Sequence, residues 1–102
     1  FGLCGAMSPS LWIARSAIFD HVKHAPFNEG RLYLDIGTRE LPRQFNRYAN
    51  TVTDSVSMLR DQLKERGYNA SRLKFVKDRG GEHNEASWAR RLPAALRFLL
   101  QP

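Results

Sequence analysis

Short apolar runs and segments with helical spacing alternate three times along this chain, and this alternation constrains its fold most. The apolar runs, typical of strands, occupy residues 2–7, 31–37 and 72–76. The segments with helical character follow at residues 9–22, at residues 51–66, and from residue 85 to the C-terminus. Strands that alternate with helices build a parallel sheet with right-handed crossovers. The sequence therefore predicts an α/β fold, with three parallel strands between layers of helices.

The run at residues 31–37 is the clearest strand. Its apolar residues are nearly continuous, which is typical of a central parallel strand buried on both faces. The first run, residues 2–7, has the same character, so Cys4 is expected to be a small buried hydrophobe. Cys4 is also the single cysteine of the chain, which excludes an internal disulfide.

The first helix is expected to begin at Ser8-Pro9, because serine is a favoured N-cap and proline a favoured first helical residue. It would run to about Val22, with Trp12 and Ile13 among its apolar residues. In the second helix apolar residues recur at steps of four, three and four and predict one buried face: Val52, Val56, Leu59 and Leu63. Gly67 is placed to end that helix as a left-handed C-cap.

The last helix has a polar start and an apolar stripe. Asn84 can cap its N-terminus, and Pro93 within it predicts a kink because proline lacks a backbone donor. The residues predicted to form its buried stripe are Trp88, Leu92, Ala95, Leu96 and Leu99.

Polar residues follow the ends of all three predicted strands. Ser8-Pro9-Ser10 follows the first strand, Gly37-Thr38-Arg39-Glu40 the second, and Gly80-Gly81-Glu82-His83 the third. In open α/β sheets ligands bind outside the carboxyl ends of the strands. We therefore expect these three loops to form the rim of an active site.

His83 is the candidate proton carrier of that rim. Histidine titrates near neutral pH, and the Gly80-Gly81 pair can present it from a tight turn. Glu40 could accept the other imidazole N–H and fix its tautomer. Asp35 and Asp78 are the competing acids, but Asp35 lies inside the strand and Asp78 is close to His83 in sequence. A plain loop histidine bonded to the backbone is the alternative to catalysis.

Metal, membrane and nucleic-acid functions find little support. His21 and His24 are three residues apart, but Lys23 lies between them and no third ligand is apparent, so we expect a solvated helix end and no metal site. No metal or cofactor is implied.

No apolar run approaches the ~20 residues of a membrane span. The net charge is +6, yet the basic residues are scattered and aromatics do not interleave with them. A protein that binds anions through this charge stays an alternative.

Residues 80–84 (Gly-Gly-Glu-His-Asn), together with residues of the last helix, resemble the C-terminal signature of a family of α/β-hydrolase esterases. The family includes enterochelin esterase-like proteins, S-formylglutathione hydrolases and feruloyl esterases. Residues 33–40 resemble its triad-acid segment, and residues 1–12 the strand and loop after its nucleophile helix. The helix residues that carry the resemblance are Trp88, Arg91, Leu92, Leu96, Phe98 and Leu99.

By this resemblance His83 matches the triad base and Glu40 the triad acid, a position where the family more often has Asp. Residues 1–102 would be the C-terminal fragment of a single α/β-hydrolase domain, with residues 47–56 as an insertion. The nucleophile Ser and the oxyanion-hole donors would lie upstream, because the chain has no Gly-x-Ser-x-Gly turn. Neither Ser8 nor Ser10 sits on such a Gly-flanked elbow, and neither is assigned a catalytic role.

The resemblance implies hydrolysis of a small-molecule carboxylic ester by the whole protein. The missing N-terminal half of the same domain would be the partner of this chain, which alone would be inactive. A non-catalytic binding module on the same scaffold is the alternative function, because a fold does not fix an activity.

Overall fold

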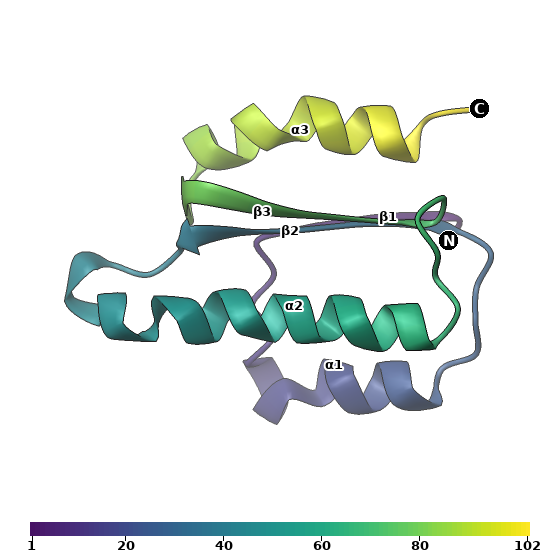
Figure 1. Ribbon diagram of the computed structural model, residues 1–102, viewed down its shortest axis with the longest axis horizontal. Coiled ribbons are helices and arrows are strands. Elements are labelled where there is room, and N and C mark those ends of the chain that lie inside the picture. Colours follow the sequence, from purple (N-terminus) through teal and green to yellow (C-terminus); the bar gives the residue numbers. More distant parts are fainter.

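Three strands and three α-helices alternate along residues 1–102 in the computed structural model of the chain (Figure 1). The strands are β1 (Leu3–Met7), β2 (Arg31–Arg39) and β3 (Leu73–Glu82). The helices are α1 (Ile13–His24), α2 (Ala49–Glu65) and α3 (Glu85–Leu99), with a short 3-10 helix, η1 (Arg43–Tyr48), before α2. The order of elements agrees with the order predicted from the apolar runs.

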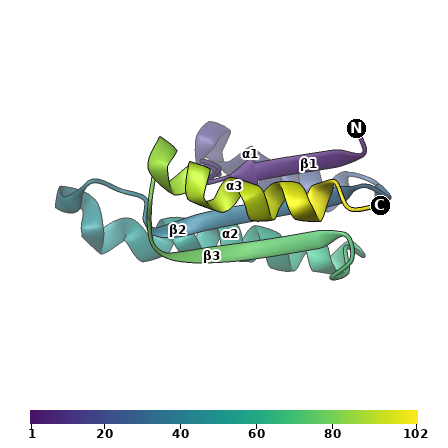
Figure 2. The ribbon, with the colours of Figure 1, turned by 90° about the horizontal axis from the view of Figure 1, so that it is seen from above.

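The strands form one parallel sheet in the order β1-β2-β3. Helix α3 covers one face of the sheet and α2 packs against the other, which makes three layers, and α1 lies on the same side as α2, farther from the sheet and packed against α2 (Figure 1). Seen from above, the three strands lie side by side beneath α3 (Figure 2). The predicted α/β fold with a parallel three-stranded sheet is therefore confirmed, and β2 is its central strand.

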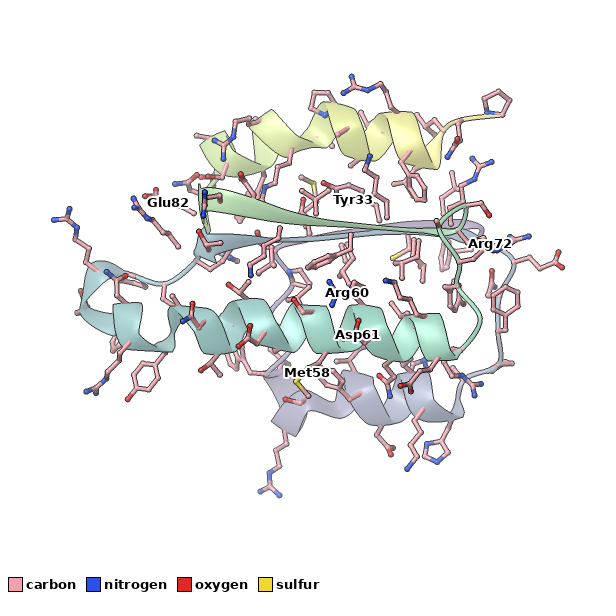
Figure 3. All side chains as sticks on the ribbon, viewed as in Figure 1. Tyr33, Met58, Arg60, Asp61, Arg72 and Glu82 are labelled. Atoms are coloured by element: carbon pink, nitrogen blue, oxygen red, sulfur yellow. The ribbon has the colours of Figure 1, made fainter.

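Alternating residues of β2 point into two separate cores. Tyr33 points between the sheet and α3, where it packs with Ala95 and Leu99 (Figure 3). Leu34 and Ile36 point to the opposite face, because successive strand side chains alternate. The larger core on that face contains Leu11, Leu34, Ile36, Val56, Leu59, Leu63, Tyr68 and Leu73.

Strand β1 differs from its prediction as a strand buried on both faces. It pairs only with β2, so it is an edge strand, and its first three residues are exposed. Cys4, expected to be buried, is exposed for the same reason. An apolar run of five or six residues cannot distinguish an edge strand from a central one, because that difference depends on which neighbour is present.

Helix α1 begins later than predicted. Ser8 is not its N-cap: it has a left-handed φ of 48° and lies buried, and the helix starts at Ile13. Residues 14–16 are also left-handed, so the first turn is irregular. Trp12 and Ile13 are exposed, and no residue of α1 is fully buried. The expected apolar face therefore does not form at this end of the helix.

Helix α2 agrees closely with its prediction. Gly67 has the left-handed φ of 106° expected of a C-cap. Val56, Leu59 and Leu63 are buried, and Val52 packs partly buried against the same core.

Helix α3 has the predicted cap but a different buried stripe. The Asn84 side chain accepts a hydrogen bond from the backbone N–H of Ser87. The helix runs through Pro93 as one element, where a kink was expected. Leu92 and Leu96, predicted to be buried, are exposed. The stripe that faces the sheet consists of Ser87, Arg91, Ala95 and Leu99, and it places an arginine in the interior.

Candidate active site

Glu40 and His83 are in contact at the carboxyl edge of the sheet. Glu40 directly follows β2 and His83 directly follows β3, next to Glu82, which marks this edge in Figure 3. The Glu40 Oε2 atom lies 2.9 Å from His83 Nδ1, within hydrogen-bond distance. The Glu40 side chain is 2% exposed and that of His83 46%. The structure thus brings together the two residues chosen from the sequence.

The tautomer of His83 follows from this contact. An ionised carboxylate only accepts hydrogen bonds, so Nδ1 must carry the proton that it donates to Glu40. The Nε2 atom then keeps its lone pair and can accept a proton from another group. The His83 ring makes no other hydrogen bond in the structure. This is the arrangement of a general base with an orienting carboxylate.

A bulge in β3 sets the position of His83. Gly80-Gly81, predicted to form a turn after the strand, lies inside β3, which continues to Glu82. Gly37 of β2 pairs with Asp78 of β3, and Arg39 pairs with Glu82. Between these two pairs β2 advances by two residues and β3 by four. The extra residues of β3 are absorbed at Gly80, whose φ of 79° suits glycine. The Gly80 N–H also donates to Thr38 Oγ1 at 2.8 Å.

Gly37 lets the two strands and the carboxylate approach one another. A Cβ at this position would overlap the backbone carbonyl of Gly81 and would lie 2.7 Å from Glu40 Oε1. The Gly37 N–H donates to the same oxygen at 2.5 Å. The backbone of β2 therefore binds Glu40 directly, because no side chain stands between them.

Ser8 and Arg91 complete the surroundings of the carboxylate. Ser8 Oγ lies 2.7 Å from Glu40 Oε1 and accepts from Arg91 Nη2 at 3.0 Å. Arg91 Nη1 lies 2.7 Å from Asp35 Oδ1, and its Nε donates to the Ser87 carbonyl at 3.2 Å. Arg91 is 5% exposed, so the guanidinium is buried among its acceptors.

The competing acids do not contact His83. Asp35 accepts from Tyr33 at 3.0 Å and from the Ser8 N–H at 2.9 Å, beside Arg91. Burial raises the pKa of Asp35, and burial together with the Asp35 charge raises the pKa of the Tyr33 hydroxyl. Asp78 pairs with Arg90 at 2.6 Å. Glu40 is therefore the carboxylate that meets the histidine.

Trp88 forms one wall beside His83. The two rings meet edge to face, with their centroids 5.0 Å apart and their planes at 87°. The indole N–H of Trp88 is buried without a hydrogen-bond partner. The sequence predicted Trp88 as part of the buried stripe of the last helix, and the structure places it, half-buried, against the candidate base.

A polar cavity of about 540 Å³ opens beside the pair. It is lined by Arg39, Glu40, Leu41, Pro42, Arg43, Asn46, Glu82, His83 and Asn84. A smaller cavity of about 190 Å³ also reaches Glu40 and His83, from the side of Ser8, Trp12 and Ile36. The candidate base is therefore open to a small molecule, whereas its acid is covered.

The remaining candidates lie away from this site. His21 and His24 are on α1, where His24 Nδ1 lies 2.9 Å from the Asp20 carbonyl oxygen. The Ser10 side chain makes no hydrogen bond, and no hydroxyl or thiol of the chain bonds to His83. The sequence placed Ser8 on the expected rim without assigning it a role, and it missed Arg91 as a site residue. One pattern could have indicated that Arg91 faces the sheet. It lies at steps of four in a series with Ser87, Ala95 and Leu99, which are all buried.

No known protein family, curated protein or solved structure matches this chain. The fold and the site geometry define it as a small α/β domain with an acid–histidine pair at the carboxyl ends of adjacent parallel strands. None of its helices has both the length and the hydrophobicity to span a membrane.

Proposed function

We propose that the chain supplies the base and the acid of a serine esterase, as the C-terminal half of an α/β-hydrolase domain. The observation that carries the proposal is the 2.9 Å contact between His83 and a buried Glu40 at adjacent strand ends. A nucleophilic serine from the N-terminal half would complete the triad. The substrate would be a small carboxylic ester.

Each residue has a definite role in the proposed reaction. The free Nε2 of His83 would take the proton of the attacking serine and later return it to the leaving alcohol. Glu40 would hold the imidazole in the required tautomer and stabilise the imidazolium that forms. The high exposure of His83 beside a covered Glu40 supports this division, because only the base must reach the substrate.

The unpaired side of β1 supports the N-terminal half as a partner. β1 pairs with β2 only, and its outer edge offers free backbone groups. On α3, Arg90 reaches Asp78 of β3, so Leu92 and Leu96 project toward the opposite flank, over β1. Both leucines are more than 40% exposed. An added strand and a helix above it would cover this apolar flank.

Turnover in the full-length protein tests the proposal. His83→Ala and Glu40→Gln should each lower kcat for a p-nitrophenyl ester by about 10³–10⁴-fold, because each removes a member of the triad. His24→Ala is the matched control, since His24 is an exposed histidine of α1 outside the site. Equal turnover by the wild type and His83→Ala, with both folded, would refute the proposal.

A non-catalytic binding module is the second candidate. It is favoured by the lack of any hydroxyl or thiol at His83 within this chain. In that case an anionic ligand would occupy the cavity lined by Arg39 and Arg43 without being cleaved. Saturable binding of an ester by the full-length protein, with no release of alcohol, would support this alternative.

A further inference from the structure

Ser8 has an unusual backbone for a residue outside the glycine class. Its φ is 48°, in the left-handed region, and it is 3% exposed. A non-glycine residue in this region costs on the order of 1 kcal/mol, so its surroundings must hold it there. The Ser8 N–H is held by Asp35, through the side-chain Oδ1 at 2.9 Å and the backbone oxygen at 3.1 Å. The conformation aims the Ser8 side chain into the buried site.

The direction of the Ser8 hydroxyl is fixed by its neighbours. Arg91 can only donate, so Ser8 Oγ must accept from Nη2, which lies 3.0 Å away. The hydroxyl proton is then free to point at Glu40 Oε1, 2.7 Å away. Arg91 itself lies 3.9 Å from that oxygen, too far for a hydrogen bond. The serine therefore joins the arginine to the carboxylate.

We propose that Ser8 is a positioning residue, which fixes Glu40 so that one carboxylate oxygen faces His83. A direct two-bond pair with Arg91 would engage both oxygens of Glu40. With the hydroxyl between them, Oε1 is held by Ser8 and by the Gly37 N–H, and Oε2 stays available to Nδ1 of His83. The expected effect of Ser8 on turnover rests on the proposed esterase function, whereas its expected effect on the tautomer of His83 does not.

The same contacts separate Ser8 from the role of a nucleophile. Its proton is directed to Glu40 and its lone pair to a guanidinium, so neither is available for attack on a carbonyl. It makes no hydrogen bond to His83. Ser8 is also buried, with 3% of its surface exposed.

Two substitutions separate the hydroxyl from the strained backbone. Ser8→Ala removes the hydroxyl and keeps a residue that disfavours a positive φ. Ser8→Gly removes the hydroxyl and also relieves the backbone strain. It should therefore fold even if Ser8→Ala does not. Ser55→Ala is the matched control, because the Ser55 hydroxyl bonds only to the Val52 carbonyl of its own helix.

The readout is the ring tautomer of His83, measured by ¹⁵N NMR in the full-length protein above the titration range of histidine. The wild type and Ser55→Ala should show the proton on Nδ1. Both Ser8 variants should lose the Nδ1–H signal in favour of Nε2–H, and kcat should fall by roughly 10-fold to 10²-fold with little change in KM.

A retained Nδ1–H signal in folded Ser8→Gly would overturn the positioning role, whatever the activity. Loss of the signal in Ser8→Ala alone would also overturn it, because strain and not the hydroxyl would then be the cause. A protein without esterase activity in which both variants change the tautomer would refute the esterase function and uphold the positioning role.

Discussion

Gly37 is the residue at which two strands and the Glu40 carboxylate approach most closely. A Gly37→Ala change should destabilise the protein by about 1–3 kcal/mol, because the new methyl group would overlap the Gly81 carbonyl and crowd Glu40 Oε1. Chemical denaturation would measure the loss. Gly2→Ala is the control, since a Cβ at Gly2 meets no atom within 4 Å. Equal stability of the two variants would contradict the close approach.

The sequence predicted some residues of the site and missed others for a physical reason. Glu40 and His83 could be found because each directly follows a strand, and the sheet brings neighbouring strand ends together. Ser8 and Arg91 are 83 residues apart, and their contact depends on how α3 packs over the sheet. No local pattern contains that information. The resemblance included Arg91, but nothing in the sequence indicated that its guanidinium would bond to the buried Asp35.

At the scale of elements, the apolar stripe of α3 shows what a single-sequence pattern leaves open. Leu92 and Leu96 repeat at the same spacing as Ala95 and Leu99, so periodicity alone fits either flank. In the structure the sheet takes the flank with Ala95 and Leu99. Helix α2 was predicted more accurately because most residues around its apolar stripe are polar, with the exposed Met58 as an exception.

The exposed flank of α3 gives a prediction that depends on context. Leu92→Gln with Leu96→Gln should change the stability of residues 1–102 by less than about 0.5 kcal/mol, because both residues lie at the surface, 43% and 44% exposed. The full-length protein should lose on the order of 2 kcal/mol per leucine if the N-terminal half covers them. Leu99→Ala, a buried control, should cost about 2–5 kcal/mol in both. If the double variant lowered the stability of residues 1–102 and of the full-length protein equally, the flank would not be covered by the N-terminal half.

At the scale of the whole molecule, purified residues 1–102 should be a poor enzyme and a fragile domain. The chain has no hydroxyl or thiol at His83, so it should not hydrolyse a p-nitrophenyl ester in a manner that depends on His83. The open edge of β1 should also favour aggregation and a low, broad thermal transition. Light scattering and calorimetry would measure this. A monomer with a sharp transition at high temperature would be inconsistent with a missing neighbour.

Both chain ends lie at one end of the molecule, and the Glu40–His83 pair lies at the other (Figure 1). A strand that joined β1 in parallel would start near these termini and run beside the five residues of β1, over roughly 16 Å. Its following turn would then arrive beside Ser8 and the acid–histidine pair. Strand pairing alone would thus fix the position of this turn. A residue carried by the turn would reach a site already assembled at the end of the sheet, without the movement of a hinge or lid.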